Sequence, residues 1–282
     1  MRPLRVRWTC PTCKVTVKTP FCPRCGEEPL ASRDLTLRGI AAKFLHVFAS
    51  VDARAARSAR LLLRRPGELT LAWTRGVRRA YVAPFQLFLI ANVFFFALQS
   101  LTGANVFSSS LDSHLHNQDW SDLAQSMLDR RLEATHMNLE QYEPIFDRAV
   151  VLNAKALILL MTLPFALLLP LAFFRERRPF VTHVAFSLHL YTFLLLVFCV
   201  ALVAAKLSVL LGLGGLDSPI VDHVLTVANL MACAVYIHLA IGPVYDATGV
   251  LRAAKAAGLA LAAGAIVLGY RFMLFLITLY AT

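Results

Sequence analysis

The stretch Arg64–Pro84, RRPGELTLAWTRGVRRAYVAP, separates two parts of the chain that differ sharply in composition. Before it lies a basic segment that begins with two closely spaced pairs of cysteines. After it lie apolar segments long enough to cross a membrane. We therefore expect a small head and a membrane domain that meet at this arginine-rich junction.

The composition is that of a membrane protein. Apolar residues make up 58% of the 282 residues and charged residues only 16%, which excludes an ordinary soluble domain. The net charge of +11 is unevenly distributed, because residues 1–83 carry 17 Lys/Arg and 5 Asp/Glu whereas residues 102–150 carry 3 and 8. This asymmetry predicts contact with a membrane surface or an acidic partner. The chain starts with basic residues that lead into cysteines, which predicts no cleavable signal peptide.

Two C-x-x-C pairs, Cys10/Cys13 and Cys22/Cys25, are separated by eight residues. Four thiolates on a short hairpin suit the tetrahedral coordination of Zn²⁺. A redox dithiol needs only one such pair, and disulfides need an oxidising compartment. An iron site of the rubredoxin kind has a much longer gap between its pairs. We therefore predict a zinc ribbon over residues 1–30.

A closed four-cysteine zinc site stabilises a fold and leaves no open position for chemistry. We therefore expect the head to recruit a protein partner or to contact anionic lipid. Nucleic-acid binding is disfavoured, because the head has only Trp8 and Phe21 as aromatic residues and its cations are scattered.

Residues 31–83 are expected to form a basic amphipathic helix followed by the junction. From Leu37 to Leu62 apolar residues recur at three- and four-residue steps, with arginines and lysines between them. Such a helix is typical of the interface of an anionic leaflet, and the alternative is that its apolar face packs on the membrane helices. Pro66 and Gly67 are expected to end it.

Residues 84–282 predict five transmembrane helices, so the expected fold class is an all-α integral membrane protein with a zinc ribbon and an interfacial helix. The predicted spans are Pro84–Leu101, Val151–Phe174, Phe180–Leu211, Ile220–Tyr245 and Lys255–Tyr280. Each is long enough for the roughly 30 Å of hydrocarbon in a bilayer. The acidic segment 102–150 is expected to be an external loop that forms short helices.

The orientation follows from lysines and arginines in the short loops. The head, the loop at Arg175–Arg178 and the Arg252/Lys255 pair fall on one side, and the acidic loop falls on the other. The N-terminus is therefore predicted to be cytosolic and the C-terminus extracytoplasmic.

Polar side chains within the spans are the next candidates for function. Those predicted to converge on the cytosolic half of the membrane, as a polar recess, are Gln86, Asn92, His183, His189, Tyr236 and His238. The alternative is that they make ordinary hydrogen bonds between helices. Haem ligation by these histidines lacks a diagnostic spacing. Arg271 in the fifth span is a candidate partner for Asp222 in the fourth.

The sequence resembles a bacterial family catalogued as domain of unknown function 3667. The resemblance rests on the two C-x-x-C pairs, on Arg65-Pro66-Gly67, and on a G-x-R-x-x-Y-x-x-P pattern formed by Gly76, Arg78, Tyr81 and Pro84. It rests also on H-x-x-F-S-x-H at His183–His189 and on Tyr245, although Pro243 departs from the uninterrupted helix expected there. The resemblance implies a zinc-ribbon-headed protein of the bacterial inner membrane, and it implies no activity.

Motifs of hydrolases, metalloproteases and phosphate-binding loops are lacking in the sequence. We expect a non-enzymatic inner-membrane protein whose head recruits a partner or anionic lipid. One alternative is a small transporter or a lipid- or solute-handling protein that uses the recess. The other is a membrane enzyme with His183 or His189 as acid/base. The sequence is compatible with an oligomer and leaves its size open.

Overall fold

The computed structural model describes residues 7–10, 14–19, 21–24, 53–77, 80–103, 106–107, 109–118, 120–212, 215 and 218–282. The chain divides into two compact units, Met1–Ala53 and Arg54–Thr282. Most of the predicted amphipathic helix, together with Cys13, Cys25 and Arg78, lies outside the described residues.

The described part of the first unit is a small antiparallel hairpin. Strand β1 (Trp8–Thr9) pairs with β2 (Thr16–Val17), with Trp8 opposite Val17. The turn is closed by the backbone of Cys10, whose N–H donates to Val15 at 3.0 Å and whose carbonyl accepts from Lys14 at 2.9 Å. The side chain of Trp8 donates to the carbonyl of Thr19 at 2.9 Å, which holds the end of the hairpin.

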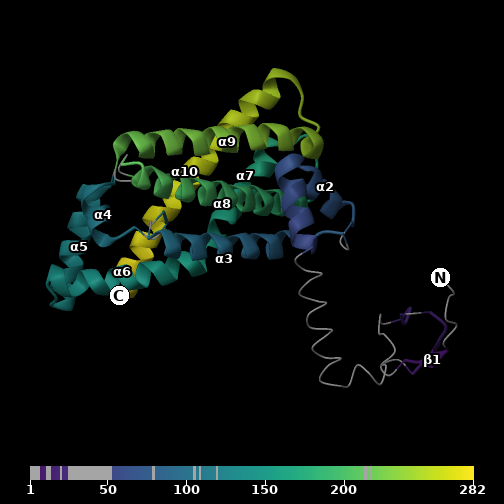
Figure 1. The fold of residues 1–282 in the computed structure, drawn as a ribbon, viewed down its shortest axis with the longest axis horizontal. Coiled ribbons are helices and arrows are strands. Elements are labelled where there is room, and N and C mark those ends of the chain that lie inside the picture. Colours follow the sequence, from purple (N-terminus) through teal and green to yellow (C-terminus); the bar gives the residue numbers. More distant parts are fainter. Residues whose placement is uncertain are drawn as a thin grey trace. The chain divides into compact units, whose positions relative to one another are not determined.

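The second unit contains the five expected apolar helices (Figure 1). Within the described residues, five helical stretches are long and apolar enough to cross a membrane, as predicted for a multi-pass membrane protein. They are α3 (Pro84–Thr102), the combined α6 (Leu139–Leu157), η2 (Ile158–Met161) and α7 (Thr162–Ala172), then α8 (Phe180–Leu210), α9 (Pro219–Tyr245) and α10 (Gly249–Ala281). The predicted all-α membrane fold class is confirmed for this unit.

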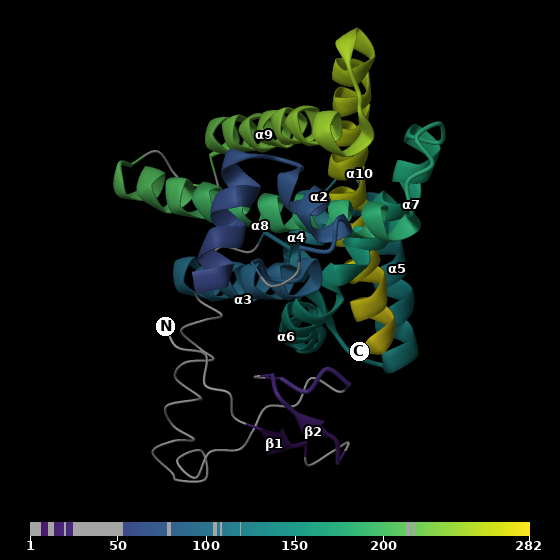
Figure 2. The ribbon, with the colours of Figure 1, turned by 90° about the vertical axis from the view of Figure 1, so that its right-hand side faces the viewer.

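Helix α8 lies at the centre of the bundle, where it packs against α3, α7 and α9 (Figures 1 and 2). Helix α10 crosses α9 steeply in both views and also packs against α6. The sequence of α8 is apolar on all sides, which is typical of a helix that spans a membrane. The core of the bundle is rich in phenylalanine, including Phe88, Phe95 and Phe165, which are fully buried.

The helix that contains the second span begins earlier than the predicted span. Helix α6 starts at Leu139, inside the segment assigned to the acidic loop, because Asn138 and Gln141 form a capping box. The Asn138 side chain accepts from the backbone of Gln141 at 2.9 Å, and the Gln141 side chain accepts from the backbone of Asn138 at 3.3 Å. These two bonds satisfy N–H groups that a helix end leaves unpaired, so a polar first turn becomes helical.

The rest of the acidic segment contains two short helices, α4 (Leu111–His116) and α5 (Ser121–Thr135), as the sequence predicted. Together with the first half of α6 they form a second apolar cluster against the end of α10, around Leu115, Leu128, Phe146 and Phe275. Tyr142 extends this contact, because its hydroxyl donates to the carbonyl of Leu279 at 3.1 Å. The acidic segment is therefore folded onto the bundle.

Candidate functional site

A helical segment over residues 53–64 and helix α2 (Glu68–Thr74) precede the first span. They are joined by Pro66 and Gly67, and Gly67 adopts a φ of +90°. A Cβ atom on this glycine would lie 2.6 Å from the carbonyl oxygen of Ala240 and 2.9 Å from Cγ of Pro243. Glycine is therefore required both by its backbone conformation and by the close approach of the turn to α9.

The segment 53–64 packs on the bundle through its apolar face. Leu62 and Ser58 are fully buried, and the Ser58 hydroxyl accepts from the backbone N–H of Val82 at 3.0 Å. The Arg57 Nε group donates to the carbonyl of Ala80 at 3.4 Å. Residues 53–64 thus show the predicted packing on the membrane helices, while their placement at the membrane interface, which can hold at the same time, stays a prediction.

The other residues of the junction pattern differ in position and exposure. Pro84 occupies the first turn of α3, where its missing N–H costs nothing. Tyr81 is half-buried against the core cluster, and Gly76 has a φ of +84° with nothing within 4 Å of its would-be Cβ atom. Arg65 is exposed.

Helix α2 reaches into the bundle and contacts His189. The Thr70 hydroxyl lies 2.8 Å from Nδ1 of His189, and the two side chains are 2% and 1% exposed. The other ring nitrogen of His189, Nε2, is buried and has no hydrogen-bond partner among the described residues. Sequence reasoning missed Thr70, because a threonine in an apolar helix gives no signal before its partner is known.

His183 makes a different contact, at the end of α9. Its Nδ1 atom lies 2.8 Å from the hydroxyl of Tyr245, and the two rings are nearly parallel, with their planes 9° apart. Tyr245 is also stacked on Phe173, with ring centroids 4.0 Å apart. Helix α9 continues through Pro243 to Tyr245, so the departure at Pro243 does not displace this tyrosine.

The six predicted recess residues differ in how deeply they are buried. His183, His189 and Tyr236 are buried in the core, Asn92 and His238 are half-buried, and Gln86 is exposed. Tyr236 stacks on Phe193 with ring centroids 4.1 Å apart. The side chains of His183, His189 and Tyr236 are thus enclosed in the core of the bundle. The polar recess on the cytosolic half of the membrane stays a prediction.

Arg252 interacts with the backbone of α9 near its internal proline. Its Nε group donates to the carbonyl of His238 at 2.7 Å, and Nη2 donates to the carbonyl of Leu239 at 3.4 Å. Pro243 has no N–H to offer the carbonyl of Leu239, four residues earlier. Gly242 leaves space for the guanidinium, since a Cβ atom there would lie 2.7 Å from Cζ of Arg252. This role of Arg252 gave no signal in the sequence beyond its charge.

Two of the four predicted zinc ligands are described. Cys10 and Cys22 are buried together with Val17 in the hairpin unit. Within the described residues no group of three or more metal-ligating side chains is found, and Cys13 and Cys25 lie outside that part of the chain. The zinc site therefore stays a prediction.

Arg271 lies near the acidic segment. Its Nη2 atom donates to the Ser109 hydroxyl at 2.9 Å. Among the described residues it makes no ion pair with Asp222, whose carboxylate contributes only to its electrostatic surroundings. The two residues of the predicted charge pair are thus neighbours without direct contact.

The comparison with protein families matches a segment that contains the junction. Residues 52–96 match the family model described as Protein of unknown function (DUF3667). The predicted resemblance to this family is confirmed over that stretch. No curated protein and no solved structure matches the chain.

The DUF3667 match covers the segment 53–64, helix α2 and two-thirds of α3. It includes Gly67, Thr70 and the whole G-x-R-x-x-Y-x-x-P pattern, and it ends before His183 and His189. The matched segment is therefore the one that supplies the contacts of Gly67 with α9 and of Thr70 with α8.

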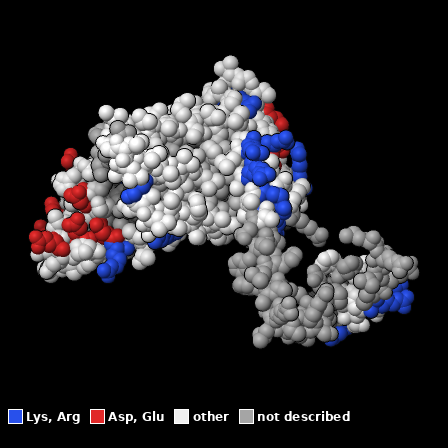
Figure 3. Space-filling model, in the orientation of Figure 1, with Lys and Arg blue, Asp and Glu red and all other residues white. Residues whose placement is uncertain are grey.

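Charge is segregated between the two ends of the helical unit (Figure 3). We call the end that holds the junction and the loops after α7 and α9 the basic end. Its cations are Arg54, Arg57, Arg60, Arg64, Arg65, Arg75, Arg175, Arg177, Arg178, Arg252 and Lys255. The acidic end carries Asp112, Asp122, Asp129, Glu133, Glu140, Glu143 and Asp147. Such segregation matches the charge bias of membrane proteins across a bilayer.

Proposed function

We propose that this protein is a multi-pass protein of the bacterial inner membrane, with its basic end in the cytosol. The support is the concentration of arginine in the short connections at that end, which is the feature that sets topology. The N-terminal head is then cytosolic and the C-terminus of α10 extracytoplasmic.

The basic end binds anionic lipid of the cytosolic leaflet. The observation that carries this proposal is the set of eleven described cations around the junction, against three acidic residues, Glu68, Glu176 and Asp246. One of these acids is already neutralised, because Asp246 pairs with Arg178 at 2.6 Å. Each exposed cation near an anionic surface contributes about 1 kcal/mol of attraction. The protein is therefore expected to act as a non-enzymatic membrane anchor.

The head carries a structural zinc ion and recruits a cytosolic protein partner. The support is the spacing of Cys10, Cys13, Cys22 and Cys25 and the burial of Cys10 and Cys22 beside Val17. The thiolates would hold the metal, and the metal would hold the hairpin closed.

Lipid binding at the basic end is tested with protein in nanodiscs that contain phosphatidylglycerol or only phosphatidylcholine. Native mass spectrometry after release counts the phosphatidylglycerol that stays bound. Replacing exposed Arg60, Arg64 and Arg75 by glutamine is expected to reduce that count. The matched control replaces Arg130, Arg131 and Lys206, which lie away from the junction, and removes the same charge. Equal counts for the two variants would refute this role of the basic end.

A second candidate function is handling of a lipid or solute within the bundle. It is favoured by the buried, unpartnered Nε2 atom of His189 and by the 3₁₀ turn η2, which interrupts the second span. Interrupted helices and unpaired polar groups inside a membrane are common at transport sites. Under this function His189→Ala abolishes function in cells while loss of the zinc ligands does little, and the anchor function predicts the reverse.

A further inference from the structure

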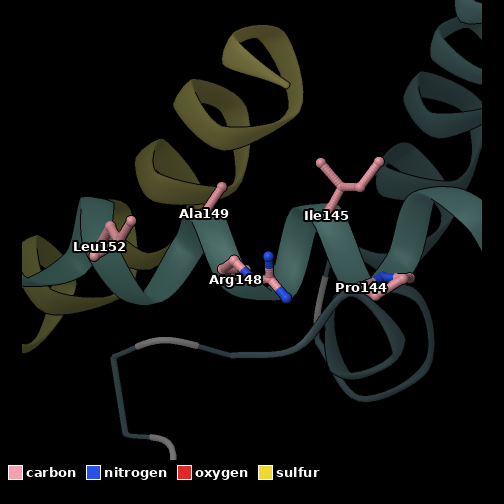
Figure 4. A pocket seen from close by; sticks show the side chains of 5 residues that line it. All are labelled: Pro144, Ile145, Arg148, Ala149 and Leu152. Carbon is pink, nitrogen blue, oxygen red and sulfur yellow. The ribbon is translucent and has the colours of Figure 1, made fainter.

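Helix α6 carries a shallow groove on its outer surface, far from the junction along the chain. The groove has a volume of about 470 Å³ and is lined by Pro144, Ile145, Arg148, Ala149 and Leu152 (Figure 4). All five residues come from one helix, and four of them are apolar. Neither the junction nor the predicted recess includes any of them.

Arg148 is the only polar side chain of the lining. It is exposed, and it makes no hydrogen bond or ion pair with another described residue. Lys155 follows seven residues later, so it lies on the same face of α6, and it too is exposed without a described partner. Two unpaired cations therefore share a face with an apolar groove.

The acidic residues of α6 do not neutralise this face. Asp147 is engaged elsewhere, because its carboxylate accepts from the backbone N–H of Leu111 at 2.8 Å. Glu143 lies five residues before Arg148, which places it about 140° away around a helix of 3.6 residues per turn. Glu140 lies eight residues before Arg148, which is about 12 Å along the helix axis. The groove is thus locally positive even though the acidic end as a whole is negative.

The depth of these residues follows from the length of the second span. The stretch Leu139–Ala172 has 34 residues, which corresponds to about 51 Å of helix, whereas the hydrocarbon of a bilayer is about 30 Å thick. Counted from Ala172, the hydrocarbon then ends near Leu152. Arg148 lies just outside this boundary, and Lys155 lies just inside it, where its long side chain extends toward the headgroups.

We propose that this groove binds one phospholipid of the leaflet at the acidic end, with the phosphate held between Arg148 and Lys155. The acyl chain lies against Leu152 and the apolar part of the second span that follows it, and Ala149 lies beside the phosphate. The headgroup substituent lies beside Pro144 and Ile145. Two cations that flank one phosphate provide charge-assisted hydrogen bonds, and an arginine can form two of them at once.

The test measures binding of phosphatidylethanolamine to the full-length protein in mild detergent by native mass spectrometry. This lipid has no net charge, so it separates the groove from the anionic-lipid site proposed at the basic end. Arg148→Gln combined with Lys155→Gln is expected to weaken binding at least about tenfold. The matched control is Arg131→Gln with Lys206→Gln, which removes the same charge outside the groove and is expected to leave binding unchanged.

A second pair of variants tests the groove without changing charge. Leu152→Trp fills the apolar part of the groove and is expected to displace the lipid. Leu163→Trp places the same side chain at another exposed position, on α7, and is expected to have no effect. Diacylglycerol, which lacks the phosphate, is expected to bind at least about tenfold more weakly than phosphatidylethanolamine.

The proposal is overturned if either groove variant binds phosphatidylethanolamine as well as its control. It is also overturned if diacylglycerol binds equally well, because the phosphate would then contribute nothing. Neither result bears on the basic end, whose own test uses phosphatidylglycerol and a different set of arginines.

Discussion

The hydroxyl of Thr70 and the Nδ1 atom of His189, 119 residues apart in the chain, lie 2.8 Å from each other in the core. This contact fastens a seven-residue helix of the junction to the central membrane helix. It also gives the arginine-rich junction a structural role that its charge alone does not predict. Residues 54–77, before the first span, are a packed part of the membrane domain.

Thr70→Val keeps the shape of the side chain and removes its hydroxyl. The change leaves Nδ1 of His189 buried without a partner, which costs about 1–3 kcal/mol. We expect a lower apparent melting temperature for detergent-solubilised protein, measured by intrinsic fluorescence. Thr74→Val is the matched control, because the Thr74 hydroxyl is exposed and bonds only to carbonyls of its own helix. Equal melting temperatures for the two variants would contradict a stabilising role for the contact.

Gly67→Ala is expected to be more damaging than Gly76→Ala, although both glycines have positive φ. An alanine in this region of φ costs about 1–2 kcal/mol at either position. At Gly67 the added Cβ atom would also lie 2.6 Å from the backbone oxygen of Ala240, whereas at Gly76 it meets nothing within 4 Å. The comparison is made by melting temperature and by yield of monodisperse protein. A Gly67 variant no less stable than the Gly76 variant would disprove the close approach to α9.

The sequence predicted the membrane helices well because their signal is local. Length and apolarity placed the start of α3 at Pro84, the start of α8 at Phe180 and the end of α9 at Tyr245. The start of α6 was misplaced because its first turns are polar, and their helix depends on a capping box and on packing against α10.

The contacts within the bundle were much less predictable. His183 and His189 were identified as polar residues of one helix, but the direction of each side chain depends on which partner helix it meets. Tyr245 and Thr70 lie 62 and 119 residues from them, so no spacing in the sequence reports either contact. Tyr236 was grouped with them by depth, and it faces Phe193 instead.

His114 is expected to make the fold of the acidic end sensitive to pH. Burial, with a further contribution from the positive charge of Arg271, lowers the pKa of His114 from 6.5 to about 4. Above pH 6.5 the imidazole is neutral in both the folded and the unfolded segment. As the pH falls from 6.5 toward 4 only the unfolded segment binds the proton, so stability is lost over that window.

The measurement for His114 is hydrogen exchange of α4 and fluorescence of Trp120 between pH 7.5 and 4. Trp120 donates to Nδ1 of the neutral imidazole at 3.3 Å, and a proton on that nitrogen removes the acceptor. His114→Phe removes the titrating group, and we expect it to flatten the pH dependence. His116→Phe is the control, because His116 is exposed and pairs with Asp112 of its own helix. A pH profile unchanged in the His114 variant would exclude this residue as its cause.

Metal removal is expected to affect the head without affecting the membrane domain. Among the described residues of the head, the buried apolar cluster is small, around Val17 and Trp8, so we expect the hairpin to depend on the predicted zinc ion. Purified protein should contain one zinc per chain by elemental analysis, and Cys10→Ser or Cys22→Ser should abolish it. Chelation should increase proteolysis within residues 1–30 while the melting temperature of the helical unit stays the same. Zinc that survives both substitutions would refute the predicted coordination.

Arg252 and Pro243 are expected to be energetically coupled through the carbonyl of Leu239. In native α9 this carbonyl lacks the N–H that residue 243 would supply, and Arg252 donates to it at 3.4 Å. Arg252→Leu is therefore expected to cost about 1–2 kcal/mol in the native background. In a Pro243→Ala background the helix supplies its own donor, so the same substitution should cost less. A double-mutant cycle on melting free energies measures the difference, and strict additivity would show that Arg252 acts only through the carbonyl of His238 or through its charge.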